Sequence, residues 1–541
     1  MGILNAARVP FVRNGQKQLG LIIILFSVIS LSSGCNNSSD KAPTAQNKEK
    51  TVQEITIAYG LDTDAQSVRN SGDMLLKIFT TERLVELEGT KVVPGLAESW
   101  DIRKNGETII FNLRKGLSFS DGSPFNANAV KFTFERLMAF NSSAWTEIDR
   151  INHLEIIDPY TIAVHYKDGM SGYIALTAFA EYGCSILSPN SVKPEGNPRA
   201  AIVSLSGTGP WMIVDYQENQ YTVFVHNPHY HGVRPVLDKI TIKTIPKAEA
   251  RVLAIQSGGV DVVVDYCHGG SAYTPRNMLK SLKEQGFKIL KKEMPMTTYL
   301  VFNYKKAPWN DVQVRKAFNH AINKDDIAAL FDGWINTAKT ALFADMAPYI
   351  SDAGTAVIPF NRQKAKQLLL DTGFPLHGSI NLIAQGQNPD EVKLCEVIKA
   401  QLMEVGVDVQ LDVLESGGYL ERTKNGKYDL RIYYVGGPER RIFTRMDGRF
   451  NPDASEFGEY GFFAAQEITA VLKKAVSSFD EEERKINFHQ FYEIVNELAA
   501  GVPLYFNAVF VVCKPEIEGI KFISSEPRFD SVQLESNRRH E

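Results

Sequence analysis

The segment from Val92 to Leu137 constrains the fold more tightly than any other part of this 541-residue chain. Its pattern predicts a short amphipathic turn at Leu96–Trp100, a strand at Thr108–Leu113 behind an Asn-Gly turn, and a helix from Ala127 to Phe140. Asn126 is suited to begin that helix, because its side-chain oxygen can accept a hydrogen bond from the first turn. The segment contains no nucleophile, general base or metal-ligand cluster. It therefore predicts a scaffold rather than a reactive site.

Three stretches of this segment carry fixed spacings of a recognisable kind. They are Leu-Ala-Glu-Ser-Trp at 96–100, Phe-x-Leu-Arg-x-Gly-x-x-Phe-Ser-Asp-Gly-x-Pro-Phe at 111–125 and Ala-x-x-Val-x-x-x-Phe at 127–134. Together they resemble the signature of the family 5 extracellular solute-binding proteins, which are the dipeptide, oligopeptide and nickel receptors of ABC importers. The segment Val312–Lys324 resembles a second hallmark of that family.

The resemblance implies an α/β, two-lobed, periplasmic-binding-protein-like fold of class II (cluster C), with mixed sheets and a ligand cleft between the lobes. In such a fold the chain crosses between the lobes twice, and the two crossings form a hinge. We expect lobe I to comprise residues 54–266 together with 506–541, and lobe II to comprise residues 267–505.

The residue pattern beyond the first segment also predicts a mixed α/β protein. Ile380–Ile383, Val392–Val405 and Val407–Leu411 have the patterns of a strand, a helix and a strand, which predicts a βαβ unit. Near the C-terminus, Val502–Phe506 and Val509–Val512 predict two separate strands.

The N-terminus predicts export and lipid attachment. A basic stretch, residues 8–17, precedes an apolar run from Leu19 to Leu31 that is short for a membrane span and typical of a signal peptide. The following Leu-Ser-Ser-Gly-Cys resembles a lipobox, although Leu31 stands one residue further from Cys35 than is usual. We expect residues 1–34 to be a lipoprotein signal peptide and residues 35–53 to be the lipidated Cys35 and a flexible tether.

Lipidation at Cys35 predicts an extracytoplasmic location, in the periplasm or at the cell surface, with the protein anchored to the membrane. The alternative, a buried or disulfide-bonded Cys35, requires a structured partner. The polar residues 36–50 do not offer one.

Composition and motifs exclude several classes of function. The apolar share of 44% and the charged share of 23% are ordinary for a globular protein, and the net charge of −4 comes with no basic stripe for nucleic acid. No G-x-S-x-G, H-E-x-x-H or P-loop sequence occurs. We therefore expect a non-enzymatic protein that has no resident cofactor and does not bind nucleic acid.

Histidines and cysteines suggest two further sites, and both have simpler interpretations. His226, His229 and His231 surround a proline at a strand end, where alternation directs neighbouring side chains apart, so we expect a structural turn. Cys267 and His268 could bind a soft metal or act as a nucleophile and base. The side chains of adjacent residues seldom point at one atom, so we expect a hinge loop. The cysteines other than Cys35 have spacings that fit no zinc site and are expected to be isolated thiols: Cys184, Cys267, Cys395 and Cys513.

Within the family, the chain resembles the nickel-binding branch most, and this resemblance implies the wall of the ligand site. Tyr59, Met74 and Trp145 stand where that branch has an aromatic residue, a methionine and a tryptophan of its pocket. Tyr182 stands where the branch has a ligand-binding arginine. We expect these side chains to form an apolar and aromatic wall in the cleft.

The segment 434–441 departs from the family pattern and is where we expect specificity to lie. In the nickel branch a metal-binding histidine follows this segment, but residues 378–488 of this chain contain no histidine, so we expect no directly coordinated metal. Glu439 can hold the ammonium group that peptide receptors bind with an aspartate. Arg440 or Arg441 can clamp an anion, because a guanidinium binds a carboxylate through two hydrogen bonds and stays charged when desolvated. Surface pairing of these arginines with nearby carboxylates is the alternative.

The resemblance thus implies a lipid-anchored receptor of an ABC importer that captures a small peptide-like or carboxylate-bearing ligand, such as a nickel or other metal chelate, by hinge closure. Its partners would be the ABC permease and ATPase complex, the small ligand and the membrane, and we expect a monomer. Two alternatives remain: an oligopeptide or dipeptide receptor, and a surface sensor or adhesin that uses the same fold without transport.

Overall fold

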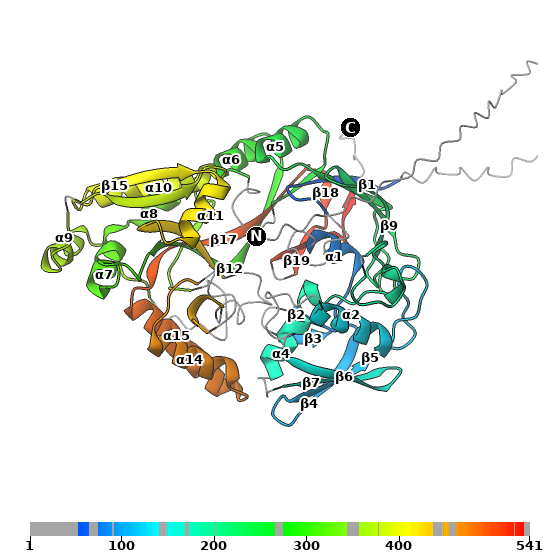
Figure 1. Cartoon of the computed structure of the whole chain (residues 1–541). Coiled ribbons are helices and arrows are strands. Elements are labelled where there is room, and N and C mark those ends of the chain that lie inside the picture. Colours follow the sequence, from blue (N-terminus) through cyan, green and yellow to red (C-terminus); the bar gives the residue numbers. More distant parts are fainter. Residues whose placement is uncertain are drawn as a thin grey trace, which may run out of the picture. The chain divides into compact units, whose positions relative to one another are not determined.

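An 11-stranded mixed sheet connects most of the elements of the chain (Figure 1). Its strands follow the order β15-β14-β16-β12-β17-β11-β1-β10-β9-β8, and β13 pairs with β17 beside this path. Their bounds are β1 Glu54–Tyr59, β8 Trp211–Gln217, β9 Tyr221–His226, β10 Lys239–Thr244, β11 Val262–Asp265, β12 Lys288–Phe302, β13 Asn336–Thr337, β14 Ile380–Gln385, β15 Val409–Leu414, β16 Leu430–Gly436 and β17 Gly501–Cys513.

The structure is a computed structural model that describes residues 52–63, 74–88, 91–139, 148, 150–167, 172–200, 202–265, 274–342, 356–376, 378–436, 446, 448–453, 461–523 and 525–534. All of these ranges belong to one compact unit within residues 52–541. No helix within the described ranges is long and apolar enough to cross a membrane.

The long strands β12 and β17 join the two flanks of the large sheet. Residues 288–293 of β12 pair with residues 508–513 of β17, and residues 297–301 pair with residues 501–506, with an irregularity of register between Glu293 and Thr297. On one side of this pair, β11 pairs with the C-terminal half of β17; on the other side, β16 pairs with the C-terminal half of β12. Figure 1 shows the pair running between the elements around α10 and those around β9. The lobe boundaries at residues 266/267 and 505/506 stay predictions.

The prediction of two separate C-terminal strands is wrong, because β17 is a single strand from Gly501 to Cys513. Asn507 interrupts the apolar pattern. Its side-chain amide donates to the carbonyl of Met296 at 3.1 Å and to Oγ1 of Thr298 at 2.8 Å, within the register irregularity of β12. A satisfied polar side chain therefore allows the strand to continue through a position where the sequence suggests a break.

A second sheet of four antiparallel strands, in the order β4-β5-β7-β6, contains two strands of the segment Val92–Leu137, β4 and β5. Its strands are β4 Ala97–Arg103, β5 Thr108–Leu113, β6 Ile151–Asp158 and β7 Thr161–Tyr166. The prediction of an amphipathic turn at Leu96–Trp100 is wrong, because the pairing of β4 with β5 draws these residues into a strand. The Asn-Gly turn does join the two strands, with positive φ angles of 51° at Asn105 and 78° at Gly106.

The helix predicted from Ala127 is confirmed as α2 (Ala127–Ala139), which packs against β6 and β7 of this small sheet. Asn126 accepts hydrogen bonds from the amide nitrogens of Asn128 and Ala129, at 2.9 and 3.3 Å. Val130 and Phe134 are fully buried. Burial of each such side chain contributes about 1.5–3 kcal/mol.

The predicted βαβ unit is confirmed, since β14 and β15 pair in parallel and α10 (Pro389–Met403) connects them. Helix α14 (Gln466–Ser477) packs against the longer helix α15 (Glu481–Glu497).

The remaining helices are α1 Met74–Thr80, α4 Gly172–Phe179, η2 Tyr182–Cys184, η3 Pro189–Ser191, α5 Ala248–Gln256, α6 Arg276–Glu284, α7 Val312–Ala321, α8 Lys324–Leu330, α9 Arg362–Asp371 and α11 Ser416–Lys424. The remaining strands form short two-stranded pairs: β2 Val85–Glu88 with β3 Lys91–Pro94, β18 Ile517–Glu518 with β21 Gln533–Leu534, and β19 Lys521–Ile523 with β20 Glu526–Arg528.

Candidate functional site

Tyr59 and Tyr182 are the predicted wall residues whose side chains the structure describes. Tyr59 ends β1 and is 2% exposed, and Tyr182 begins η2 and is 6% exposed. Both belong to one hydrophobic cluster that includes Met296 of β12, and Tyr434 near the end of β16 packs against this cluster. The ends of β1 and β16, the helix η2 and the irregular part of β12 therefore meet in this hydrophobic cluster. Contact of either tyrosine with a ligand stays a prediction.

The other predicted site residues cannot be placed in the same way. Met74 begins α1, but its side chain lies outside the described part of the structure. The following residues lie wholly outside the described ranges: Cys35, Trp145, Glu439, Arg440 and Arg441. Their roles stay predictions.

Two charged side chains contact Tyr182, and no sequence pattern predicts either contact. Its hydroxyl donates a hydrogen bond to the buried carboxylate of Glu526 in β20. The guanidinium carbon of Arg83 lies 4.1 Å from the centroid of the Tyr182 ring, and Arg83 also forms an ion pair with Glu86. Cation–π and hydrogen-bond contacts from different elements hold the ring in one orientation. Tyr182 is therefore a rigid part of this cluster.

Neighbouring Arg528 also belongs to this charged group. Its pKa is raised above the usual value although burial opposes the charged form, because Asp530, the Tyr182 phenol, Glu86 and Glu526 surround it. Oppositely charged residues thus accompany both cations at this site, buried Arg83 and partly buried Arg528.

The C-terminal edge of the parallel strands contains a second polar group. The carboxylate of Glu391, in the first turn of α10, accepts hydrogen bonds from the backbone amide of Gln385 at 2.9 Å and from the hydroxyl of Tyr434 at 3.0 Å. Burial raises the pKa of Glu391 to about 7, against the lowering effect of these hydrogen bonds and of Arg431. Ligands of open α/β sheets bind at this edge of parallel strands. The strand β16 ends here, at Gly436, and the chain continues into the predicted Glu439–Arg441 clamp.

A buried ionic group ties helix α6 to both flanks of the large sheet. The carboxylate of Asp265, at the end of β11, lies 3.7 Å from the guanidinium of Arg251 and 3.7 Å from that of Arg276. Asp265 also accepts hydrogen bonds from the backbone amide of Thr274, at 2.8 and 2.9 Å. The backbone amide of Arg276 donates to Asp390 in α10 at 3.2 Å. Both ends of the segment that holds Cys267 and His268 are thus fixed, while those two residues lie outside the described ranges.

A cavity of about 620 Å³ opens between β3, the β4–β5 turn, α4 and α15. Its lining includes Lys91, Asn105, Tyr173, Glu481 and Arg484. The volume lies in the range of small-molecule sites. Of the predicted ligand-binding residues whose side chains the structure describes, neither Tyr59 nor Tyr182 lines this cavity.

The histidines at 226 and 231 have separate partners. Nδ1 of His226 accepts a hydrogen bond from Nε of Arg234 at 3.0 Å, and its Nε2 donates to the carbonyl of Leu237. Nε2 of His231 lies 3.0 Å from the carboxylate of Glu82, and this hydrogen bond raises the pKa of His231. These contacts agree with the structural turn that the sequence predicts.

The prediction of isolated thiols agrees with the described cysteines. Cys184, Cys395 and Cys513 are all buried. Burial raises the pKa of Cys513 to about 11, which disfavours the reactive thiolate.

Three potential metal ligands that no sequence pattern indicates lie together on the four-stranded sheet: His153, Glu155 and His165. The first two are adjacent on one face of β6, but the third is across a hairpin whose register contains irregularities. A period-2 pattern alone does not give that register.

Comparison with known proteins supports the class that this fold defines, an extracellular solute-binding protein. A family model described as "Bacterial extracellular solute-binding proteins, family 5 Middle" matches residues 91–447. The chain therefore belongs to the bacterial extracellular solute-binding proteins of family 5, and the predicted family and the predicted α/β periplasmic-binding-protein-like fold are confirmed.

Relatives with assigned ligands are similar over almost the whole chain. The nickel-binding periplasmic protein of Escherichia coli (strain K12) is 25% identical over 503 residues, which cover 89% of this chain and 94% of the relative. The dipeptide-binding protein of the same organism is 26% identical over 493 residues, which cover 84% of this chain and 88% of the relative. Both relatives are named as binding proteins rather than enzymes.

The fold is shared with a solved structure, the crystal structure of NikA from Brucella suis in complex with Fe(III)-EDTA. The TM-score is 0.80 at 24% sequence identity, and the match covers 89% of this chain and 99% of that chain.

Proposed function

We propose that this protein is the lipid-anchored, extracytoplasmic receptor of an ABC importer, and that it captures a small carboxylate-bearing ligand by closure of two lobes. Membership of family 5 over residues 91–447 is the observation that carries this proposal. The β12–β17 pair supports the closure step, because it alone connects the two flanks of the described sheet. A ligand that touches both flanks favours the closed form by its differential affinity for the two forms.

A metal chelate is the form of carboxylate ligand that we favour. The nickel-binding periplasmic protein of E. coli is similar over 89% of this chain. The segment after β16 contains Arg440 and Arg441 and no histidine, which suits recognition of the organic carboxylates of a chelate rather than coordination of the metal itself. The metal would then be cargo, and the protein would need no resident cofactor.

A peptide ligand is the second candidate, because the dipeptide-binding protein of E. coli is similar over 84% of this chain. In that case Glu439 would hold the ammonium group, and an arginine would hold the terminal carboxylate. The carboxylate is common to both ligands, so the clamp alone does not distinguish them.

Native mass spectrometry of the protein purified from its own host distinguishes the two candidates. We expect a co-purified organic ligand together with nickel or cobalt. Recovery of mixed short peptides without metal would support the peptide receptor instead. Calorimetry with the recovered ligand then tests the clamp, and we expect Arg440→Ala or Arg441→Ala to weaken binding at least tenfold. Unchanged affinity in both variants would remove the arginines from the site.

The anchor and the transport role need separate experiments. Cys35→Ser is expected to move the protein from the membrane fraction to the soluble fraction, because the acyl chains attach to the cysteine. Deletion of the gene is expected to abolish uptake of the recovered ligand. Normal uptake would favour the surface sensor or adhesin.

A further inference from the structure

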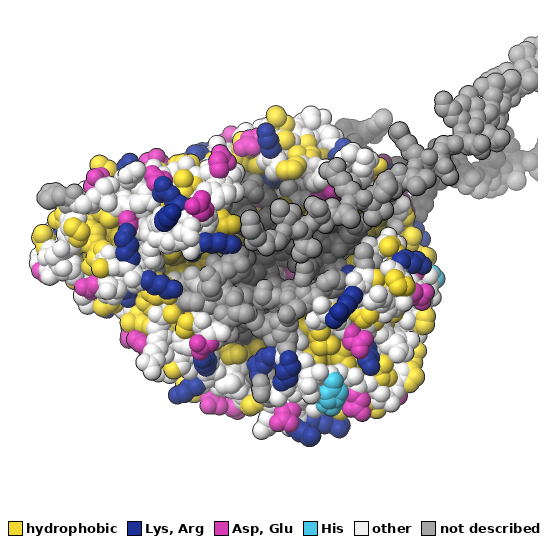
Figure 2. Space-filling view, in the orientation of Figure 1, with side chains coloured by type: hydrophobic (Ala, Val, Ile, Leu, Met, Phe, Trp, Pro, Cys, Tyr) yellow, Lys and Arg dark blue, Asp and Glu magenta, His cyan; other side chains and the backbone are white. Residues whose placement is uncertain are grey.

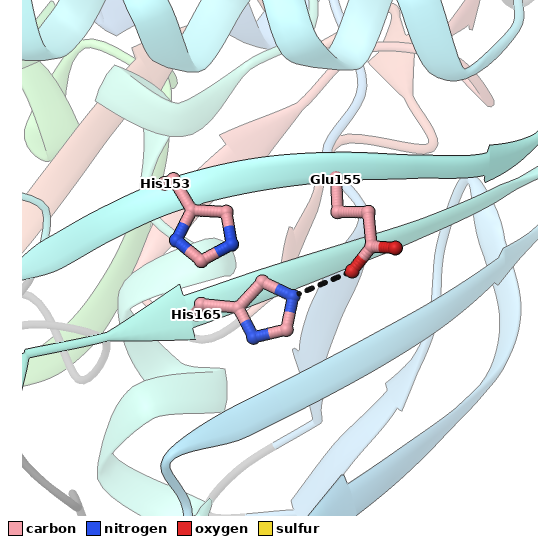
Figure 3. A group of neighbouring side chains, drawn as sticks. All are labelled: His153, Glu155 and His165. Carbon is pink, nitrogen blue, oxygen red and sulfur yellow. Dashed lines mark hydrogen bonds and ion pairs between the residues drawn. The ribbon is translucent and has the colours of Figure 1, made fainter.

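Three side chains that commonly bind transition metals meet on the outer surface of the four-stranded sheet (Figure 3). The potential ligand atoms of His153, Glu155 and His165 all lie within 4.8 Å of one another. Nε2 of His165 is 3.0 Å from the carboxylate of Glu155. The rings of His153 and His165 are stacked, with centroids 4.2 Å apart and an interplanar angle of 11°. Figure 2 shows histidine side chains next to acidic side chains on the surface over β6 and β7.

The backbone of the β6–β7 hairpin fixes this arrangement. His153 is directly opposite His165 in the antiparallel register, so their side chains lie on the same face. Glu155 follows two residues later on β6 and shares that face. The intervening Leu154 and the neighbouring Val164 are buried in the core on the other side. The three side chains therefore meet because of strand pairing rather than through the chance position of a loop.

His165 also has the supporting contact that metal-binding histidines usually have. Oγ1 of Thr108, on the adjacent strand β5, lies 3.1 Å from Nδ1 of His165. With Nε2 on a metal, the Nδ1–H group donates to this hydroxyl and holds the ring in the required orientation. The hydroxyl can donate instead when no metal is present, so the contact persists in both states.

One basic side chain near the group is already paired with a carboxylate. Arg103 of β4 pairs with Thr108 of β5, which in turn pairs with His165 of β7, so these residues lie in line across the sheet. Its guanidinium is 2.6 Å from the carboxylate of Asp101, which offsets its charge. A simple ion pair between Glu155 and His165 would explain only part of the arrangement, because exposed pairs are worth at most about 1 kcal/mol and do not involve His153.

We propose that His153, Glu155 and His165 form a surface binding site for a divalent transition metal ion of the Ni²⁺, Zn²⁺ and Cu²⁺ group. Two imidazoles and one carboxylate suit these ions, whereas Mg²⁺ and Ca²⁺ prefer oxygen ligands alone. Metal–ligand distances of about 2.0–2.2 Å require the ligand atoms to approach one another more closely. Rotation of the exposed His153 and Glu155 side chains toward half-buried His165 allows that approach. At least one coordination position remains for water or for a ligand from outside. The proposal does not depend on the ligand of the cleft.

Isothermal titration of the full chain with NiCl₂ and ZnCl₂, after removal of metals with EDTA and dialysis, tests this site. The double variant His153→Ala/His165→Ala is expected to lose one equivalent of bound metal relative to the wild type. Glu155→Gln, which keeps the size of the side chain, is expected to weaken binding at this equivalent at least tenfold. His229→Ala is the matched control, because it removes an exposed histidine outside the group, and it should bind as the wild type does.

Crystals soaked in ZnCl₂ provide a direct readout, with an anomalous peak expected between the three side chains. Equal stoichiometry and affinity in the wild type and the double variant, or zinc peaks only elsewhere, would overturn the proposal. Thermal unfolding without metal checks that the variants fold, and added Zn²⁺ should raise the Tm of the wild type more than that of the double variant.

Discussion

The guanidinium carbon of Arg484 in α15 lies 4.9 Å from the ring centroid of Tyr173 in α4. Both residues line the cavity of about 620 Å³. In the predicted division of the chain, Tyr173 belongs to lobe I and Arg484 to lobe II. The contact therefore joins the two predicted lobes, and a cation–π contact of this kind is worth about 1 kcal/mol.

Arg484→Ala is expected to favour the open form, because it removes this contact between the lobes. We expect the affinity for the co-purified ligand to fall about fivefold, which corresponds to about 1 kcal/mol. Small-angle scattering of the ligand-free protein should show a larger radius of gyration, and Tyr173→Leu should have the same effect. Arg199→Ala, at an exposed position, is the control. Identical scattering and affinity in both contact variants would mean that the contact has no influence on closure.

Glu391 is expected to make stability depend on pH. Its pKa in the folded protein is about 7, above the ordinary value of 4.5. Between these pH values the unfolded chain has lost the proton while the folded protein keeps it, so the free energy of unfolding falls as pH rises. The full loss is about 3 kcal/mol and is complete near pH 7. Denaturant titrations of Glu391→Gln should show a flatter dependence between pH 4.5 and 7 than the wild type. Glu396→Gln, an exposed change on the same helix, should keep the wild-type slope.

The fold was predictable where local pattern and family signature agreed. The strand at Thr108–Leu113, helix α2 and the parallel pair β14–β15 have clear periodicity and good boundary residues. The prediction failed where pairing between distant residues decides the conformation. Residues 97–100 form a strand because β5 offers them backbone partners, and β17 continues through Asn507 because β12 satisfies that side chain.

Asn507→Ala tests this last explanation. The substitution leaves the carbonyl of Met296 and the hydroxyl of Thr298 without the bonds that the amide donates, inside a fully buried strand. We expect the free energy of unfolding to fall by about 1–3 kcal/mol, measured by urea denaturation. Asn128→Ala, at an exposed position of α2, should change it by less than about 0.5 kcal/mol. A similarly small change for Asn507→Ala would show that the strand continues without this contact.

The candidate site was predictable only through family resemblance, which suggested Tyr59 and Tyr182 but none of their partners. Arg83 and Glu526, which contact Tyr182, come from opposite ends of the chain, and no periodicity relates them. The metal-ligand group on β6 and β7 was missed for the same reason. A histidine and a glutamate two residues apart are common on a strand, and only the register across the hairpin adds His165.

Tyr182→Phe separates the structural role of this residue from its predicted role in the ligand site. The variant keeps the aromatic ring under Arg83 and removes the hydroxyl that donates to buried Glu526. We expect the free energy of unfolding to fall by about 1–3 kcal/mol, while ligand affinity stays within about twofold of the wild type. Tyr182→Ala should reduce both quantities. Tyr221→Phe removes a hydroxyl that donates to exposed Asp215 at 3.0 Å, and it should change stability by less than about 0.5 kcal/mol. Loss of ligand binding in Tyr182→Phe without loss of stability would mean that the hydroxyl contacts the ligand, and that its bond to Glu526 is not what fixes the ring.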